Sequence, residues 1–432
     1  MGSGAGKGSQ AEVVHVAPPK ISAPLMGSFG GKSGDPAPFY PDTLLAADVG
    51  GTSARLHLFK PPEEEENALL VPEDCIIASE KYASGKWDSL IDVLRDFLSR
   101  ASPDGGPIVP VAACLAVAGA VVDNKCHLPN LGWDCDGAKI AKALGIQEVH
   151  LINDFEAQGY GILTLDKSGS EVDVLQDVPP LAGAPIAVLG AGTGLGEAYM
   201  TTGENGDYEV WPSEGGHAEF APRQDGSSKL QFEMCQYLQI KYSAKSRISV
   251  ERIVSGRGIA NIYQFLAHKF PEKVNKAVHR KFLGDIQASA KNDPAAIVEA
   301  ARKGECEISK QALDVFVDCY GSEAGVVALK YMPFAGLYIT GGVTSKTSDF
   351  ITAPSNQGNP NAFMDSFLDK GRVSPMLMRV PVYMVRGENM GERGVKYKAM
   401  RMYQEWGLAR KPSKGHSCFR TASHVSRTVS RP

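Results

Sequence analysis

The feature that most constrains the fold is a unit that occurs twice: an apolar run, a glycine turn with a threonine, and a second strand-like run. The two copies are ADVGGTSARLHLF at residues 47–59 and VLGAGTGLGEAYM at residues 188–200. Short apolar runs stopped by glycines are typical of buried strands, so each copy predicts a strand–turn–strand hairpin. Two such hairpins favour an internally duplicated α/β fold with one hairpin in each half. Chance similarity between two Gly/Thr turns is the alternative.

Strands and helices are predicted to alternate around these hairpins. The strand candidates are 43–49, 55–59, 75–82, 111–118, 149–152, 185–189, 197–201, 336–340 and 381–385. Apolar residues at helical spacing indicate helices over 87–100, 137–144, 229–241, 258–268, 294–302, 309–331 and 392–406. A loop of roughly twenty residues, longer than most connections, is expected between the two series. The length of 432 residues exceeds what one hydrophobic core usually organises, so two domains are expected.

The two ends of the chain differ in composition from the rest. Residues 1–40 are rich in Gly, Ser, Ala and Pro without apolar periodicity, which predicts a disordered lead-in. Residues 410–432 carry six Lys or Arg residues and no acid, and are interpreted as a basic tail. The formal net charge of −4 gives no reason to expect nucleic acid or a membrane surface as a partner. No apolar run is long enough to span a membrane and no secretory signal is recognisable, so a cytoplasmic location is expected.

The first glycine turn combines groups that suit a phosphate and a metal ion. Gly50 and Gly51 would let phosphate oxygens approach backbone N–H groups, and Thr52 offers a hydroxyl donor. Asp48 ends the preceding strand, where a carboxylate can hold the water shell of Mg²⁺. An ordinary β-hairpin with an aspartate nearby is the alternative interpretation.

The second glycine turn, residues 190–196, has glycine at every other position. A dinucleotide-binding fingerprint would need glycine where Leu195 stands and a helix directly afterwards. Residues 197–200 look like a strand instead, so the turn is interpreted as a phosphate loop carried on a hairpin. Tight-turn chemistry without a ligand is the alternative.

Asn153 and Asp154 follow a predicted buried strand. Ligands of open α/β sheets gather beyond the carboxyl ends of the strands. An aspartate at that place can accept the proton of a substrate hydroxyl as it attacks phosphorus. Capping of the following helix is the alternative, because Asn and Asp are favoured at that position.

A third polar segment, 214–217, places Glu214 and His217 around two glycines. Glycines let a ligand come near the backbone, and both side chains suit the hydroxyls of a polyol. Glu251 is a further acidic candidate, for which a solvated acid at a helix start is the alternative. A zinc site is disfavoured, because none of the eight cysteines forms a Cys-x-x-Cys pair and His217 lacks partners at ligand spacing.

In order along the chain, these segments resemble the bacterial-type glucokinase family of the sugar kinase, actin and heat-shock ATPase superfamily. DVGGTSARL is similar to its first phosphate motif, GAGTGLGEA to its second and LYITGGV to its adenosine motif, while INDF, EGGH and ERIVSG are similar to its sugar-binding segments. The match extends from about Asp42 to Trp406. Ser53 stands where the family usually has asparagine, and both ends exceed its usual length. The zinc signature of ROK-type sugar kinases is absent, as is the helix-turn-helix pattern of ROK-type repressors in 1–40.

The resemblance implies a two-domain, duplicated ribonuclease H-like (actin-like ATPase) fold with an interdomain cleft. Its implied boundaries are 41–165 plus 388–409 for a small domain and 166–387 for a large one. It further implies ATP-dependent phosphorylation of glucose by a homodimer, with ATP and Mg²⁺ as cofactors. A kinase for fructose, mannose or glucosamine is the main alternative, and a sugar-independent actin-like ATPase or a sugar-binding protein without turnover are others.

The resemblance also implies a role for each candidate residue. The implied catalytic base is Asp154. The implied sugar ligands are Asn153, Asp154, Glu214, His217 and Glu251. The implied contacts to ATP phosphates are Gly50, Gly51, Thr52, Gly192, Thr193 and Gly194, with Gly341 and Gly342 against the adenosine and Asp48 orienting Mg²⁺ through water.

Overall fold

The computed structural model describes residues 43–62, 70–101, 108–167, 169–223, 228–243, 247–284, 292–355 and 357–410, all within the compact unit Pro38–Pro432. The expected lead-in at 1–40 lies outside these residues, and so does the basic tail at 410–432 except for Arg410. Within the described part of the chain, no helix is both long and apolar enough to cross a membrane.

The first sheet carries the first glycine turn. Its strand order is β3-β2-β1-β4-β7, with β1 (Leu44–Val49), β2 (Ser53–Phe59), β3 (Ile76–Ala83), β4 (Ala112–Val117) and β7 (Glu148–Asn153). β1, β4 and β7 are parallel, while β2 and β3 complete an antiparallel edge. The register pairs Asp48 with Ala116, and Val117 with Asn153. Because carboxyl ends of parallel strands meet at one edge of a sheet, Asp48 and Asn153 lie at the same edge.

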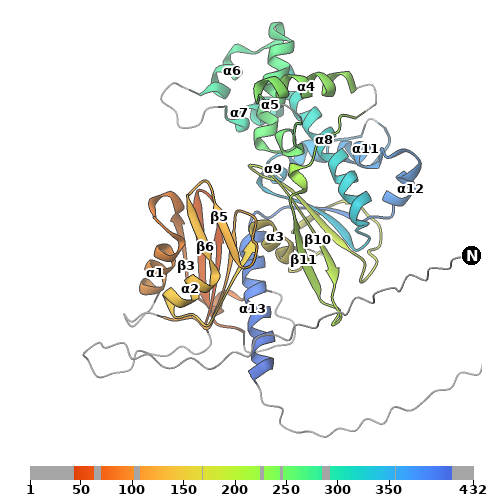
Figure 1. The fold of residues 1–432 in the computed structure, drawn as a ribbon. Coiled ribbons are helices and arrows are strands. Elements are labelled where there is room, and N and C mark those ends of the chain that lie inside the picture. The colour runs from red at the N-terminus through yellow and green to blue at the C-terminus, as the bar shows by residue number, and fades with distance from the viewer. Residues whose placement is uncertain are drawn as a thin grey trace, which may run out of the picture. The chain divides into compact units, whose positions relative to one another are not determined.

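Different helices cover the two faces of this sheet, and both faces are apolar. One core joins the sheet to α1 (Leu90–Arg100), α2 (Gly137–Leu144) and the hairpin of β5 (Lys125–Leu128) and β6 (Trp133–Asp136). The other core joins it to α13 (Met390–Arg410) and α3 (Asp154–Ile162). Figure 1 shows α1 and α2 on one side of the sheet and α13 on the other. Burial on both faces explains the almost unbroken apolar runs of β1 and β4.

The second sheet repeats this arrangement around the second glycine turn. Its strand order is β11-β10-β9-β12-β13-β8, with β8 (Val172–Gln176), β9 (Ile186–Ala191), β10 (Leu195–Thr202), β11 (Tyr208–Ser213), β12 (Gly336–Thr340) and β13 (Val382–Val385). β9, β12 and β13 are parallel, and β10 and β11 continue the sheet in antiparallel order, as β2 and β3 do in the first sheet. The prediction of a duplicated α/β fold is confirmed.

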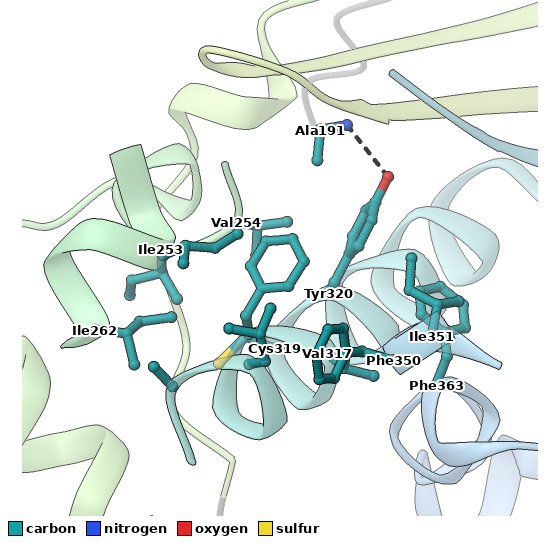
Figure 2. Packing of buried hydrophobic residues seen from close by; sticks show 14 of the residues in the cluster. Ala191, Ile253, Val254, Ile262, Val317, Cys319, Tyr320, Phe350, Ile351 and Phe363 are labelled. Atoms are coloured by element: carbon teal, nitrogen blue, oxygen red, sulfur yellow. Dashed lines mark hydrogen bonds between the residues drawn. The ribbon is translucent and has the colours of Figure 1, made fainter. Parts of the chain in front are cut away.

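The helices between β11 and β13 share one apolar core with the second sheet. They are α4 (Ser228–Lys241), α5 (Gly256–Lys269), α6 (Lys276–Leu283), α7 (Pro294–Arg302), α8 (Glu307–Tyr331), α9 (Gly342–Lys346), α10 (Ser348–Ile351), α11 (Ala362–Leu368) and α12 (Ser374–Leu377). Of these, α8 and α9 contact the strands of that sheet directly. The short 3-10 turns are η1 (Glu73–Cys75), η2 (Ser84–Lys86), η3 (Gly215–His217), η4 (Val250–Arg252), η5 (Pro271–Lys273) and η6 (Gly371–Val373). Figure 2 shows Tyr320 of α8 at the centre of this core, with its ring among apolar side chains and its hydroxyl reaching the N–H of Ala191.

The structure corrects the sequence prediction at several elements. The loop expected between the two series contains β8, an edge strand that pairs with β13. The sequence prediction also missed β11 and the β5–β6 hairpin. These strands are short and mix polar with apolar residues, and Val174 of β8 is 51% exposed. β8 pairs with the distant β13, whereas β11 pairs with β10 and β5 with β6, so backbone pairing rather than a local apolar pattern makes them strands.

Candidate active site

Two carboxylates lie at the carboxyl edge of the first sheet. Asp48 is the second-to-last residue of β1, and Asp154 is the first residue of α3, directly after β7. Burial, then the negative charge of Asp48, and more weakly that of Glu214, raise the pKa of Asp154 to about 6. The pKa of Asp48 is raised as well, chiefly by burial. A carboxylate with such a pKa is mostly ionised at neutral pH and is more basic than an ordinary aspartate, as a proton acceptor should be.

Asn153 caps the helix that carries Asp154. Its Oδ1 accepts hydrogen bonds from the backbone N–H groups of Phe155 (2.8 Å) and Glu156 (3.3 Å). Its Nδ2 donates to the carbonyl oxygen of Gly119 (3.0 Å). The capping alternative for this segment is therefore confirmed for Asn153. The cap ties α3 to the loop after β4 and so holds Asp154 in place.

Residues 214–217, named the sugar turn after the sugar-binding role expected from the sequence, bring together the other acidic and imidazole candidates. His217 Nε2 lies 3.8 Å from Glu214 Oε2, and His217 Nδ1 lies 4.0 Å from Glu251 Oε1. Glu214 and His217 are exposed, whereas Glu251 on η4 is only 24% exposed. Backbone bonds tie the two segments together, with Val250 N–H donating to Ala218 O (3.0 Å). The structure thus gathers Glu214, His217 and Glu251 into one polar cluster.

The second glycine turn lies directly beside this cluster. A Cβ placed on Gly194 would come within 2.5 Å of Glu251 Oε2, so the carboxylate contacts the turn. Gly192 donates its N–H to Gly194 O (2.9 Å) and accepts from Gly256 N–H (2.9 Å). A Cβ on Gly192 would meet nothing within 4 Å, so this part of the turn is open to a ligand.

Gly190 and Gly196 of the same turn serve another purpose, which the sequence interpretation missed. A Cβ on Gly190 would lie 2.8 Å from Phe155 Cε2, and a Cβ on Gly196 would collide with the same ring. Neither glycine has a positive φ, so space and not backbone conformation requires them. Phe155 directly follows Asp154, and its ring therefore joins the helix of Asp154 to the second glycine turn.

A pocket of about 690 Å³ opens beside this turn. Three residues predicted to hold ATP line it: Gly192, Thr193 and Gly342. The other lining residues come mainly from helices and were not predicted: Lys241, Tyr242, Gly256, Arg257, Ala260, Asn261, Gln264, Asn292, Pro294, Val343 and Lys346. The volume falls in the range of ligand pockets, and the cationic side chains suit a phosphorylated ligand.

Gly341 and Tyr320 hold the backbone next to this pocket, although neither of them lines it. Gly341 has φ of +102°, and a Cβ there would collide with the carbonyl oxygen of Ala191, so only glycine fits. The hydroxyl of Tyr320 accepts from Ala191 N–H (3.2 Å) and bonds Thr344 Oγ1 (2.8 Å). Tyr320 therefore holds the ends of β9 and β12, from which Gly192 and Gly342 follow (Figure 2).

The first glycine turn is a closed hairpin turn that leaves two residues exposed. Gly50 N–H donates to Ser53 O (2.9 Å), and Ser84 Oγ donates to Gly50 O (2.9 Å). Gly51 and Thr52 are exposed, so their backbone can be reached by a ligand. None of Gly50, Gly51 and Thr52 lines the pocket described above. The carboxylates of Asp48 and Asp154 are oxygen donors of the kind that a magnesium ion prefers, and the guanidinium of Arg55 lies 3.9 Å from Asp48 at the same edge.

The fold and this arrangement define a class, the kinases of the actin-like ATPase fold. A glucokinase from an Antarctic psychrotroph is 30% identical with TM-score 0.64, and the match covers 83% of this chain and 99% of that one. The glucokinase from Balamuthia mandrillaris in complex with glucose (21% identical, TM-score 0.65, covering 83% and 94%) shares the fold. So does a ROK family glucokinase from Streptomyces griseus in complex with glucose and AMPPNP (19%, TM-score 0.51, covering 82% and 97%).

Sequence comparison names the particular family. The profile of the family described as Glucokinase matches residues 45–402. The Synechocystis glucokinase is 39% identical over 355 residues, which cover 81% of this chain and 95% of that relative. The Nostoc glucokinase is 40% identical over 365 residues, covering 83% and 99%. The chain belongs to the glucokinase family, a family of hexose phosphotransferases.

Proposed function

We propose that this chain transfers the γ-phosphate of ATP to the 6-hydroxyl of glucose, with Asp154 as the general base. The observation that carries the proposal is the place of Asp154, which begins α3 at the carboxyl edge of the first sheet and is followed by Phe155, whose ring packs against the second glycine turn. Burial and the charges of Asp48 and Glu214 raise the pKa of Asp154 to about 6, as suits a proton acceptor. Glu214 belongs to the sugar turn, and its charge is one of the smaller causes of this raised pKa, which supports a shared site for the base and the sugar turn.

Sugar binding is assigned to five residues around this base. The residues that would bind the sugar hydroxyls are Asn153, Asp154, Glu214, His217 and Glu251. A carboxylate accepts hydrogen bonds, and an imidazole accepts or donates them. The contacts of His217 with Glu214 and Glu251 support a shared site for three of them. Removal of any of these groups would leave a sugar hydroxyl without its partner, which costs affinity.

ATP binding is assigned to the glycine turns and the large pocket. The residues that would contact the phosphates are Gly50, Gly51, Thr52, Gly192, Thr193 and Gly194. The adenosine would lie against Gly341 and Gly342. Asp48 would hold Mg²⁺ through water, and the bound ion would offset negative charge on the phosphates. The open space at Gly192 and the pocket lined by Gly192, Thr193 and Gly342 support these assignments.

In the transfer step, Asp154 would accept the proton of the sugar's 6-hydroxyl while that oxygen attacks the γ-phosphorus, the bond from the γ-phosphorus to the β–γ bridging oxygen breaks, and ADP leaves. The Asn153 cap holds the start of α3, and the ring of Phe155 packs against the second glycine turn, which keeps Asp154 at a constant distance from that turn. Glu251 contacts Gly194, so a residue proposed to bind the sugar is held directly against the second glycine turn, which is proposed to bind phosphate. Positioning of both reactants in this way lowers the barrier.

We also propose a small domain of 41–165 plus 388–409 and a large domain of 166–387, which close on the sugar across an interdomain cleft. The assignment of each sheet to one sequence range and the packing of α13 on β1 and β4 support this division. The active form is proposed to be a cytoplasmic homodimer. Light scattering that finds only monomer, or cell fractionation that finds the protein elsewhere, would contradict these two points.

The decisive test measures ADP release by purified protein with Mg-ATP, with and without glucose and then across fructose, mannose and glucosamine. We expect glucose-dependent ADP release with glucose 6-phosphate as product. Asp154→Asn should lower kcat by about 10²–10⁴-fold with a modest change in glucose KM. Asp134→Asn is the matched control, because Asp134 is 88% exposed. Sugar-independent hydrolysis would favour an actin-like ATPase, and preference for another hexose would change the substrate.

A further inference from the structure

Glu197 on β10 is a buried carboxyl group without a partner. The residue is 1% exposed, and neither Oε1 nor Oε2 has a hydrogen-bond partner among the described residues. Its neighbours on the same face of the strand are Leu195 and Tyr199. Burial of an unpaired polar group costs free energy, and burial of an unpaired charge costs more. A buried acid retained in such a place calls for an explanation.

Glu197 lies directly beneath the sugar turn. A Cβ on Gly215 would collide with Glu197 Oε2 and would lie 3.1 Å from Oε1. A Cβ on Gly216 would collide with the carbonyl oxygen of Leu195. Ser213 is the cross-strand neighbour of Glu197, and its Oγ accepts from Gly215 N–H (3.0 Å). β10 therefore supports two successive residues of the turn, and at Gly215 the supporting group is the carboxyl.

We propose that Glu197 is a positioning residue for glucose binding: its buried carboxyl group sets the place of Gly215 and, through it, the places of Glu214 and His217. The inference rests on the proposed function, because it assigns glucose to the sugar turn. Glu197 itself is too buried to touch the sugar and acts only through the backbone of Gly215.

The surroundings of Glu197 make this support depend on its protonation. Burial, and then the negative charge of Glu323 on α8, raise the pKa of Glu197 to about 7, while Lys330 on α8 acts in the opposite direction. On the sugar turn, the charged and titratable groups are Glu214 and His217, both exposed. The cross-strand neighbours on β9 and β11, Leu189 and Ser213, carry no charge.

The affinity for glucose is therefore expected to change between pH 6 and pH 8. At the lower pH Glu197 is neutral, and the turn rests on an uncharged group. At the higher pH the carboxylate is ionised, repelled by Glu323 and attracted by Lys330 on α8, so the side chain shifts and Gly215 loses its support. If only the neutral form supports binding, glucose affinity falls about tenfold from pH 6 to pH 8.

The experiment measures glucose binding by calorimetry, without nucleotide, at pH 6, 7 and 8. We expect the wild type and the control Glu204→Gln, an exposed acid on the β10–β11 connection, to lose about tenfold in affinity by pH 8. Glu197→Gln keeps the shape of the side chain without its charge, and its affinity should change less than about twofold. Glu323→Gln removes the charge that raises the pKa of Glu197 and should move the midpoint to lower pH.

Three outcomes would overturn the inference. The first is a tenfold loss that persists in Glu197→Gln, which would assign the titration to a group other than Glu197. The second is a glucose affinity of the wild type that does not change with pH. The third is a pH midpoint of glucose affinity that is the same in Glu323→Gln as in the wild type, and this outcome can be measured even if Glu197→Gln does not fold. Absence of glucose binding at every pH would instead contradict the proposed function.

Discussion

The aromatic ring of Phe155 fills the space beside Gly196, so that a side chain at position 196 would collide with it. Phe155 follows Asp154 in α3, and Gly196 is the second residue of β10, the return strand of the second glycine turn. The ring is 7% exposed, and it also contacts Gly190 at the other end of that turn. The two glycines and the ring therefore set the distance between the proposed base and the loop proposed to hold phosphate.

Gly196→Ala tests this relationship. The added methyl group must displace the ring of Phe155 and with it the start of α3. Overpacking of this kind costs about 1–3 kcal/mol, and we expect kcat to fall by about tenfold to a hundredfold. Steady-state kinetics with glucose would measure this. Gly85→Ala is the control, since Gly85 is exposed and a Cβ there meets nothing within 4 Å. Wild-type kcat in Gly196→Ala would show that Phe155 does not position Asp154.

The pH dependence of kcat/KM for glucose should show an acid limb with a midpoint near the pKa of Asp154, about 6. A general base must be ionised, so activity is lost as pH falls through this pKa, tenfold for each unit below it. An ordinary aspartate would place the limb near pH 3.9. A limb at the ordinary value, with full activity at pH 5, would contradict the role of Asp154.

Tyr320→Phe should weaken nucleotide binding without a matching effect on glucose. The substitution leaves the buried N–H of Ala191 and the hydroxyl of Thr344 without the Tyr320 hydroxyl. Loss of such a partner costs about 1–3 kcal/mol. We expect a raised KM for ATP, an unchanged KM for glucose and a lower free energy of unfolding. Tyr331→Phe, on the same helix in a ring stack with Tyr199, serves as control. Equal ATP KM values in the two variants would rule out a role for Tyr320 at the pocket.

The free energy of unfolding should reveal the ionisation of Glu197. Its pKa in the folded protein, about 7, lies above the ordinary value of 4.5, so the folded state binds the proton more tightly than the unfolded state. Stability from this group is therefore lost as pH rises from about 4.5 to 7 and stays lost above it. At pH 8, Glu197→Gln should be more stable than wild type by about 3 kcal/mol, and the difference should nearly vanish at pH 4.5. Urea unfolding at both pH values would measure this, and a pH-independent difference would contradict it.

The sequence alone determined the local elements and the motifs. β1, β9 and β12 are short apolar runs that end at glycines, and α7 begins with proline after a capping aspartate, so nearby residues specify each of them. The duplicated hairpin predicted the duplicated fold for the same reason. The candidate residues of the sugar turn could be recognised because they are adjacent in the chain.

Only the tertiary structure decided the relationships between distant residues. The ring of Phe155 meets Gly190 and Gly196, Tyr320 meets Ala191, and Glu197 lies under Gly215. β8 becomes a strand because β13 pairs with it, and the large pocket is lined mainly from helices that show no motif. Periodicity and turn chemistry act within a few residues of the chain, whereas packing, burial and pKa shifts depend on which distant groups the completed fold brings into contact.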